Sequence, residues 1–162
     1  MKINIDGAYQ PASIEGTMAC ICRDHHGKLT DGLSRHFPAC SALQAEIQAL
    51  TLTVHHLLQH DINHAQLLIE LDCLTLVETM HDCILTPWED CALFAEAPAL
   101  LSCFPNLHLQ HCKREVNVVA DWAAKAHGSA ALTHNWAISP PFYLLDHVYT
   151  DAIALGYTFP FT

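Results

Sequence analysis

The chain has 162 residues, of which 51% are hydrophobic, and this length suits one domain with a substantial core. Its 17 acidic residues outnumber the 7 Lys and Arg residues, and the resulting net charge of −10 argues against a strong nonspecific nucleic-acid binder. No apolar run reaches the roughly 18 residues of a membrane span, and the eight cysteines form no CxxC pair. We therefore expect an intracellular protein of nucleus or cytoplasm, with reduced thiols and no membrane partner.

The first stretch, Lys2 to Ala8, is predicted to be a short strand that stops near a glycine. With a period of two, Ile3 and Ile5 share one face, and Asn4 and Asp6 share the other. A buried, ionised Asp6 would need a cation, a metal ion or a full set of hydrogen-bond donors. Asp6 is therefore the first candidate functional residue.

Turn signals and hydrophobic periods divide the rest of the chain into alternating strands and helices. Pro98 is expected to bend or split one helix, and Ser41 is expected to cap another. The predicted elements are a hairpin loop at 9–16, strands at 17–23 and 28–37, a helix at 42–60, a strand at 65–72, helices at 74–83 and 88–103, a strand at 107–111 and a helix at 116–126. This order predicts an α/β fold with a mixed sheet in a domain of residues 1–128. Residues 129–162 are predicted to be a C-terminal extension, packed on the domain or trailing from it.

Four acidic residues occupy positions from which a side chain can reach one end of the predicted sheet. Asp6 ends the first strand, Glu46 lies one turn into the first helix, Asp72 follows the next strand, and Asp121 lies in the first half of the last core helix. Like charges gathered at one point require a divalent ion, and hard carboxylate oxygens suit Mg²⁺ or Mn²⁺.

Ordered segments between residue 3 and about residue 127 carry a resemblance to a known family. These segments are 4–8, 23–27, 45–50, 70–73 and 111–121. The last is the most specific, since it places His111 ten residues and Asn117 four residues before Asp121 on a strand-to-helix connection. On these segments the chain resembles the ribonuclease H family, most of all the reverse-transcriptase-like domains of plant genomes and retroelements.

The resemblance implies a ribonuclease H-like fold, with a mixed sheet of three antiparallel strands and two more, flanked by helices. It also implies a metal-dependent endonuclease that hydrolyses the RNA strand of RNA/DNA hybrids, acting as a monomer or inside a larger parent polypeptide. Two Mg²⁺ (or Mn²⁺) ions would ready a water for attack and stabilise the leaving oxygen. The residues that match the family's metal ligands are Asp6, Glu46, Asp72 and Asp121.

The same resemblance assigns roles to residues around the metal site. His111 matches a histidine that shuttles protons or helps product leave. Gly7 and Ala8 lie in the segment expected to contact the ribonucleotides, whose 2′-hydroxyls distinguish RNA from DNA. Asn117 matches a residue that contacts substrate or orders the loop.

Competing interpretations remain open. The absence of Lys and Arg between Arg35 and Lys113 favours weak activity, or a catalytically idle module that binds nucleic acid or protein within a larger chain. An exonuclease of the same broad fold is disfavoured, because such enzymes usually carry a second acid where Ala8 stands.

Histidines and cysteines suggest two further hypotheses. His56, His60 and His64 have i, i+4, i+8 spacing, and a helix could present them as a transition-metal face, although Asp61 is expected to end that helix before His64. A cysteine-nucleophile hydrolase is also conceivable, but the spacing singles out no His partner.

Overall fold

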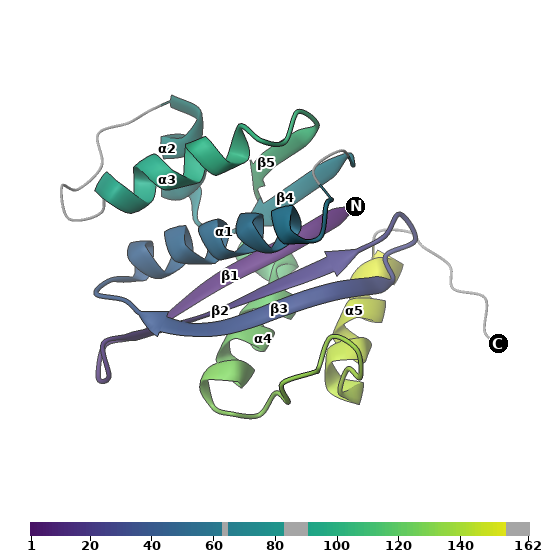
Figure 1. Ribbon diagram of the computed structural model, residues 1–162. Helices are drawn as coiled ribbons and strands as arrows, with labels where there is room; N and C mark the ends of the chain where they lie inside the picture. The colour runs from purple at the N-terminus through teal and green to yellow at the C-terminus, as the bar shows by residue number, and fades with distance from the viewer. Residues whose placement is uncertain (63–64, 83–90, 155–162) are drawn as a thin grey trace.

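A mixed five-stranded sheet forms the centre of the computed structural model, which describes residues 1–62, 65–82 and 91–154 (Figure 1). The strands are β1 (Lys2–Gln10), β2 (Glu15–Arg23), β3 (Leu29–Pro38), β4 (Leu67–Leu71) and β5 (Leu107–His111). The first three are antiparallel, β4 pairs in parallel with β1, and β5 pairs in parallel with β4, in the order β3-β2-β1-β4-β5. The predicted mixed sheet, with three antiparallel strands followed by two more, is confirmed.

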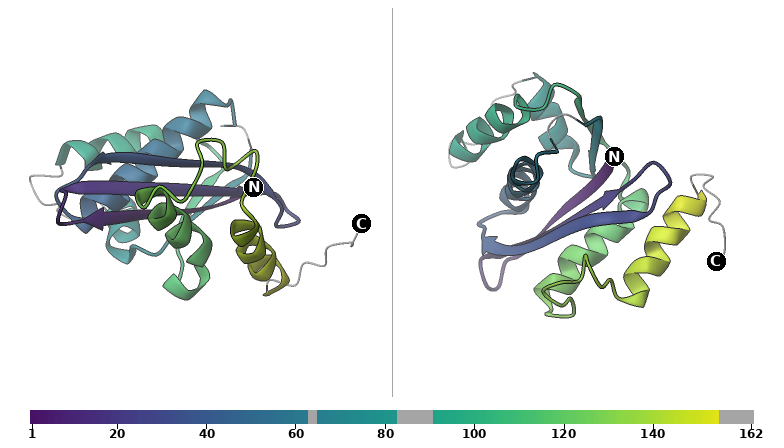
Figure 2. Two further views of the ribbon diagram at one scale, coloured as in Figure 1. Left: turned by 90° about the horizontal axis from the view of Figure 1, so that it is seen from below. Right: turned by 45° about the vertical axis from the view of Figure 1, so that its right-hand side comes forward.

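Helices cover both faces of this sheet (Figures 1 and 2). One face carries α1 (Ala42–Gln59), with α2 (Leu74–Asp82) and α3 (Cys91–Leu101) beside it. The other carries α4 (Val118–Gly128), preceded by the 3₁₀ turn η2 (Arg114–Val116), and α5 (Phe142–Ala154). Within the described ranges, no helix is both long and apolar enough to cross a bilayer.

The alternation expected in β1 is present in the structure. Ile3 and Ile5 are fully buried in the core beneath α1. Asn4 turns to the other face, where its side chain bonds to Asn117, and Asp6 is also buried. The period of two therefore sorts apolar and polar side chains as the sequence predicts.

The start of α1 is fixed by a side-chain cap. The Ser41 hydroxyl accepts a hydrogen bond from the Gln44 backbone N–H at 3.0 Å, and the Gln44 side chain accepts one from the Cys40 N–H. This reciprocal pattern satisfies backbone donors that a helix start leaves open. The buried stripe of the helix then faces the sheet, which sets the rotation of α1 and with it the position of Glu46.

Several element boundaries differ from the predictions. The hairpin loop is shorter than 9–16, because β1 extends to Gln10 and β2 begins at Glu15. The last core helix begins at Val118 rather than 116, after the 3₁₀ turn. Pro98 does not split α3, which continues to Leu101; a proline near a helix end removes only one backbone donor. The predicted residues 83 and 88–90 lie outside the described residues.

The C-terminal extension packs on the domain as far as it is described, and it contains a helix that was not predicted. Trp136 is 2% exposed, lies over Gly32 and donates from Nε1 to the Ser34 hydroxyl at 2.8 Å. Leu144 and Val148 of α5 join the core formed by α4 and β2. Since these two residues are four positions apart, they mark one buried helical face.

Candidate metal-binding cleft

Parallel strand ends bring two of the predicted acids together. In the parallel register, Asn4 of β1 is opposite Glu70 of β4, and pairing of these strands ends there. Asp6 and Asp72 each lie two residues beyond that pair. Both carboxyl groups are thus carried to the opening at the C-terminal ends of neighbouring parallel strands, where ligand sites form in α/β sheets.

A close approach of α1 to β1 adds the third acid. A Cβ atom at Gly7 would lie 2.5 Å from the Ala45 carbonyl oxygen, so only glycine permits this spacing. The Gly7 backbone N–H donates to the Glu46 carboxylate. Asp6, Glu46 and Asp72 each place an oxygen within 4.8 Å of the others.

The fourth acid, Asp121, lines the same cleft but does not join this three-residue cluster. It sits in the first turn of α4, where the Lys125 ammonium lies 2.6 Å and 2.7 Å from its two oxygens. Arg114 Nη2 lies 3.4 Å from Asp121, and Arg114 Nε lies 3.9 Å from Asp72. Two basic side chains therefore neutralise this side of the cleft.

The three-acid cluster carries more carboxyl groups than its surroundings can keep ionised. Burial, and then the charges of Asp121 and Asp72, raise the pKa of Asp6 to about 7. Burial, and then the charges of Asp6 and Asp72, raise the pKa of Glu46 to about 9. Among the described residues, nothing donates a hydrogen bond to the buried Oε2 atom of Glu46. A divalent cation would satisfy this oxygen and favour the ionised carboxylates.

The cleft itself has a volume of about 500 Å³, which leaves room for hydrated ions and a small ligand group. Gly7 and Ala8 lie on its wall beside the acids, together with Lys125 and Arg114. A larger cavity of about 650 Å³ lies at the opposite ends of β4 and β5 and holds none of the acids. The four acids therefore line the smaller of these two cavities.

The other two predicted residues lie near the cleft in different ways. His111 ends β5 in register with Leu71, one residue before Asp72, and its side chain is exposed. Asn117 is 1% exposed and donates from Nδ2 to the Ile5 carbonyl oxygen at 2.9 Å. Asn117 therefore ties the loop before α4 to β1.

Sequence reasoning did not place Lys125 and Arg114 at the site. The i, i+4 spacing of Asp121 and Lys125 was the available signal, because such residues are neighbours on a helix surface. A buried polar network behind the cleft was also missed: Asn4 bonds to Glu70, Asn117 and Arg23. This network joins three strands and the loop before α4.

Comparisons with known proteins agree with this arrangement. Residues 4–127 match a family model described as reverse transcriptase-like. No curated protein matches the chain significantly.

Among solved structures, the chain is similar to ribonuclease H1 from the halophilic archaeon Halobacterium salinarum, with 17% identity and a TM-score of 0.70 over 80% of this chain and 97% of that one. It is also similar to LC11 ribonuclease H1, isolated from compost and solved with an RNA/DNA hybrid, with 20% identity and a TM-score of 0.70 over 82% and 99%. The protease-reverse transcriptase of prototype foamy virus matches at 17% identity and a TM-score of 0.60, over 76% of this chain and 20% of the viral one. At these identities the likeness is one of fold.

Proposed function

The chain belongs to the reverse transcriptase-like family and has the ribonuclease H fold, and from this premise we propose that it is a metal-dependent endonuclease that hydrolyses the RNA strand of RNA/DNA hybrids. The observation that carries the proposal is the convergence of Asp6, Glu46 and Asp72 within 4.8 Å, at the C-terminal ends of parallel strands. Three carboxyl groups this close, two of them with raised pKa values, form a site that a divalent ion would stabilise.

The residues present fit Mg²⁺ or Mn²⁺. The donors are carboxylate oxygens, the preferred ligands of these ions, and Glu46 offers a buried oxygen that has no donor among the described residues. Asp6, Glu46 and Asp72 would hold the metal, with Asp121 joining from the edge of the cleft. When bound, a pair of such ions supplies an activated water and stabilises the leaving oxygen of a phosphodiester.

Residues around the acids would orient the hybrid. Gly7 and Ala8 form part of the cleft wall, where their backbone groups can approach the ribose 2′-hydroxyls. His111 is exposed one register position from Asp72, where it can exchange protons with solvent and assist product release. Asn117 orders the loop that carries α4 and Asp121.

The distribution of charge supports weak binding of substrate. With a net charge of −10 and no Lys or Arg between Arg35 and Lys113, the chain offers few phosphate contacts. Because the foamy virus match covers only 20% of that chain, we propose that the present fold also serves as a domain of a larger polypeptide, which supplies additional affinity.

The ion pairs of Asp121 favour one alternative, a catalytically idle module that binds nucleic acid or protein. Lys125 and Arg114 form ion pairs with Asp121. If their pairing persists when divalent ions are present, the site would lack one ligand. Because all four acids line one cleft, we favour the nuclease over the idle module.

The experiment is cleavage of an RNA/DNA hybrid labelled on the RNA strand, at low salt, where weak binding is favoured. With Mg²⁺ or Mn²⁺ the protein should cut the RNA and leave duplex DNA intact, whereas chelator should abolish cutting. Asp72→Asn should reduce cleavage by several orders of magnitude.

The matched control is Asp146→Asn, which makes the same chemical change at an exposed position on α5, and it should retain full activity. If the wild-type protein shows no metal-dependent cleavage of hybrid, the idle module replaces the nuclease. Equal cleavage by Asp72→Asn and wild type would contradict the assignment of the site.

A further inference from the structure

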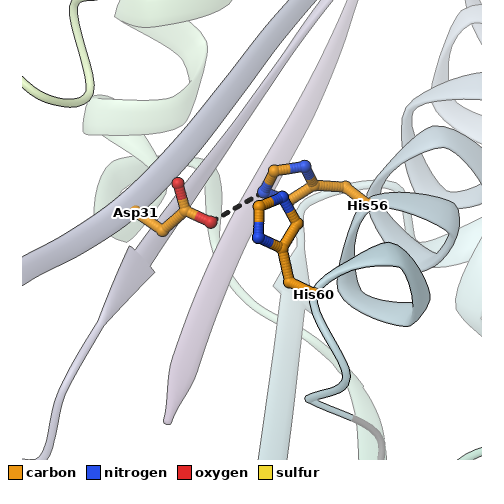
Figure 3. Close-up of side chains that lie close together, drawn as sticks. All are labelled: Asp31, His56 and His60. Atoms are coloured by element: carbon orange, nitrogen blue, oxygen red, sulfur yellow. Dashed lines mark hydrogen bonds and ion pairs between the residues drawn. The ribbon is translucent and has the colours of Figure 1, made fainter.

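We propose that the chain contains a second metal centre, a site for Zn²⁺ or a similar borderline divalent ion formed by Asp31, His56 and His60. Figure 3 shows these side chains converging between β3 and the C-terminal end of α1. Each offers a ligand atom, and the three atoms lie within 4.8 Å of one another. The sequence indicated a transition-metal face on His56, His60 and His64, but His64 lies outside the described residues, and Asp31 was not foreseen.

The two histidines are arranged as a metal-binding pair. They are four positions apart at the end of α1, where His60 is the capping residue, and their ring centroids are 4.4 Å apart. Residues with i, i+4 spacing on one helical face can bind a single ion through both imidazoles. The C-terminal end of a helix also carries partial negative charge, which favours a cation there.

Asp31 reaches this pair because side chains alternate along β3. In the regular register of β2 and β3, Asp31 is opposite Cys22 and lies two residues before the buried Leu33. Opposed residues of antiparallel strands point to the same face, and Cys22 belongs to the core on the α1 side. Asp31 therefore lies on the face of β3 that is turned to α1, as Leu33 does.

The Asp31 carboxylate is held in place by both of its oxygens. Oδ1 accepts a hydrogen bond from the Gly32 backbone N–H at 2.7 Å, and Oδ2 lies 2.7 Å from His56 Nε2. Such a bond to one oxygen orients a carboxylate whose other oxygen binds an ion. The His56 and Asp31 side chains are 13% and 32% exposed, whereas His60 is exposed, so an ion can enter from solvent.

The ligands of the Asp31, His56 and His60 site suit a different metal ion from the one that suits the acidic cleft. Two imidazoles and one carboxylate, with an open position for water, suit Zn²⁺, whereas Asp6, Glu46 and Asp72 offer oxygens only. Zinc bonds of about 2.0–2.1 Å in a tetrahedral site place donor atoms roughly 3.4 Å apart. The hydrogen-bonded atoms of Asp31 and His56, 2.7 Å apart, must separate slightly. Because no two of the three ligand atoms are more than 4.8 Å apart, no pair must close by more than about 1.4 Å, a shift within reach of side-chain rotation.

The proposed zinc site is separate from the cleft. His56 lies ten positions after Glu46 on the same helix, which corresponds to roughly 15 Å at the helical rise per residue. An ion at this position would link the end of α1 to β3. The proposal therefore does not depend on nuclease activity, and the two can fail independently.

The test is calorimetric titration of Zn²⁺ into protein freed of affinity tags and stripped with chelator, with excess Mg²⁺ present to occupy the acidic cleft. Wild type should bind one Zn²⁺ per chain, and zinc should raise its thermal midpoint. His60→Ala should weaken binding by about 100-fold or more, beyond the loss typical of outer-shell changes, and Asp31→Asn by at least about 10-fold. Co²⁺ bound by wild type should give visible absorption bands that His60→Ala lacks.

His55→Ala is the matched control, because His55 is adjacent to His56 but pairs with Glu96 instead. It removes one imidazole from the same helix and should leave zinc binding unchanged. His60 is exposed, so its replacement should fold normally, which circular dichroism checks. The proposal is overturned if wild type binds no stoichiometric zinc, or if neither His60→Ala nor Asp31→Asn weakens zinc binding. Asp31 and His56 would then be a hydrogen-bonded pair without a metal role.

Discussion

Replacing Glu46 with Gln should make the metal-free protein less sensitive to pH, and more stable than wild type at pH 8. Glu46 is half-buried beside Asp6 and Asp72, and desolvation followed by the charges of these two acids raises its pKa from 4.5 to about 9. Folding at neutral pH without metal therefore requires this carboxyl group to take up a proton. Glutamine has nearly the same shape, can still accept the Gly7 N–H, and has no charge to neutralise.

The magnitude follows from proton linkage. Between pH 4.5 and about 9 the folded protein binds more protons at Glu46 than the unfolded chain does, so stability falls as pH rises. From pH 5 to pH 8 this amounts to at most about 4 kcal/mol, at 1.36 kcal/mol per unit. Asp6 acts in the same direction between pH 3.8 and about 7. The two contributions are not additive, because the charge of Asp6 is one cause of the raised pKa of Glu46.

The measurement is urea unfolding at pH 5 and pH 8 in chelator, followed by tryptophan fluorescence. Wild type should lose about 2–4 kcal/mol across this interval, and Glu46→Gln should lose clearly less. Added Mg²⁺ should restore the unfolding free energy of wild type at pH 8 but should stabilise Glu46→Gln only weakly. Glu78→Gln, the same change at an exposed position on α2, should behave as wild type. A Glu46→Gln protein with the pH dependence of wild type, or one less stable at pH 8 in chelator, would refute the reasoning.

Three further substitutions test residues that neutralise or shape the cleft. Lys125→Met removes the ammonium 2.6 Å from Asp121; Mg²⁺ affinity measured by calorimetry should rise several-fold, while stability changes by less than about 1 kcal/mol. Gly7→Ala would place a Cβ 2.5 Å from the Ala45 carbonyl oxygen, and thermal unfolding should show a loss of about 1–3 kcal/mol, with weaker Mg²⁺ binding. Asn117→Ala leaves a carbonyl of β1 without its buried donor, and urea unfolding should show a cost of about 1–3 kcal/mol together with reduced hybrid cleavage.

The parts of the fold that sequence predicted are those set by local periodicity. Alternation in β1 separates Ile5 from Asp6, and the Ser41 cap with its apolar stripe sets the start and rotation of α1. Because the carboxyl ends of parallel strands meet at one edge, Asp6 and Asp72 could be expected to converge once both strands were recognised.

The parts that were missed depend on contacts between distant segments. Asp31 meets His56 across 25 positions of the chain, and no local pattern in β3 says which residue of α1 lies opposite it. In the part of α5 whose burial is described, residues 142–150, Leu144 and Val148 are buried beside exposed aromatic residues that obscure the apolar face. The spacing of Asp121 and Lys125 signalled one ion pair of Asp121, whereas the pair with Arg114 joins the helix to the turn before it and has no such signal.

Charge balance at the cleft connects these observations. Burial and neighbouring carboxylates raise the pKa values of Asp6 and Glu46, so without a metal ion the fold favours the protonated form of these two groups. Two basic side chains offset part of this repulsion, since Lys125 pairs with Asp121 and Arg114 lies near both Asp121 and Asp72. Glu46 is left with a buried oxygen that no described residue satisfies. A divalent ion would satisfy this oxygen. Because such an ion binds only the folded state, its binding would offset the loss of folding stability that the clustered acids cause without metal.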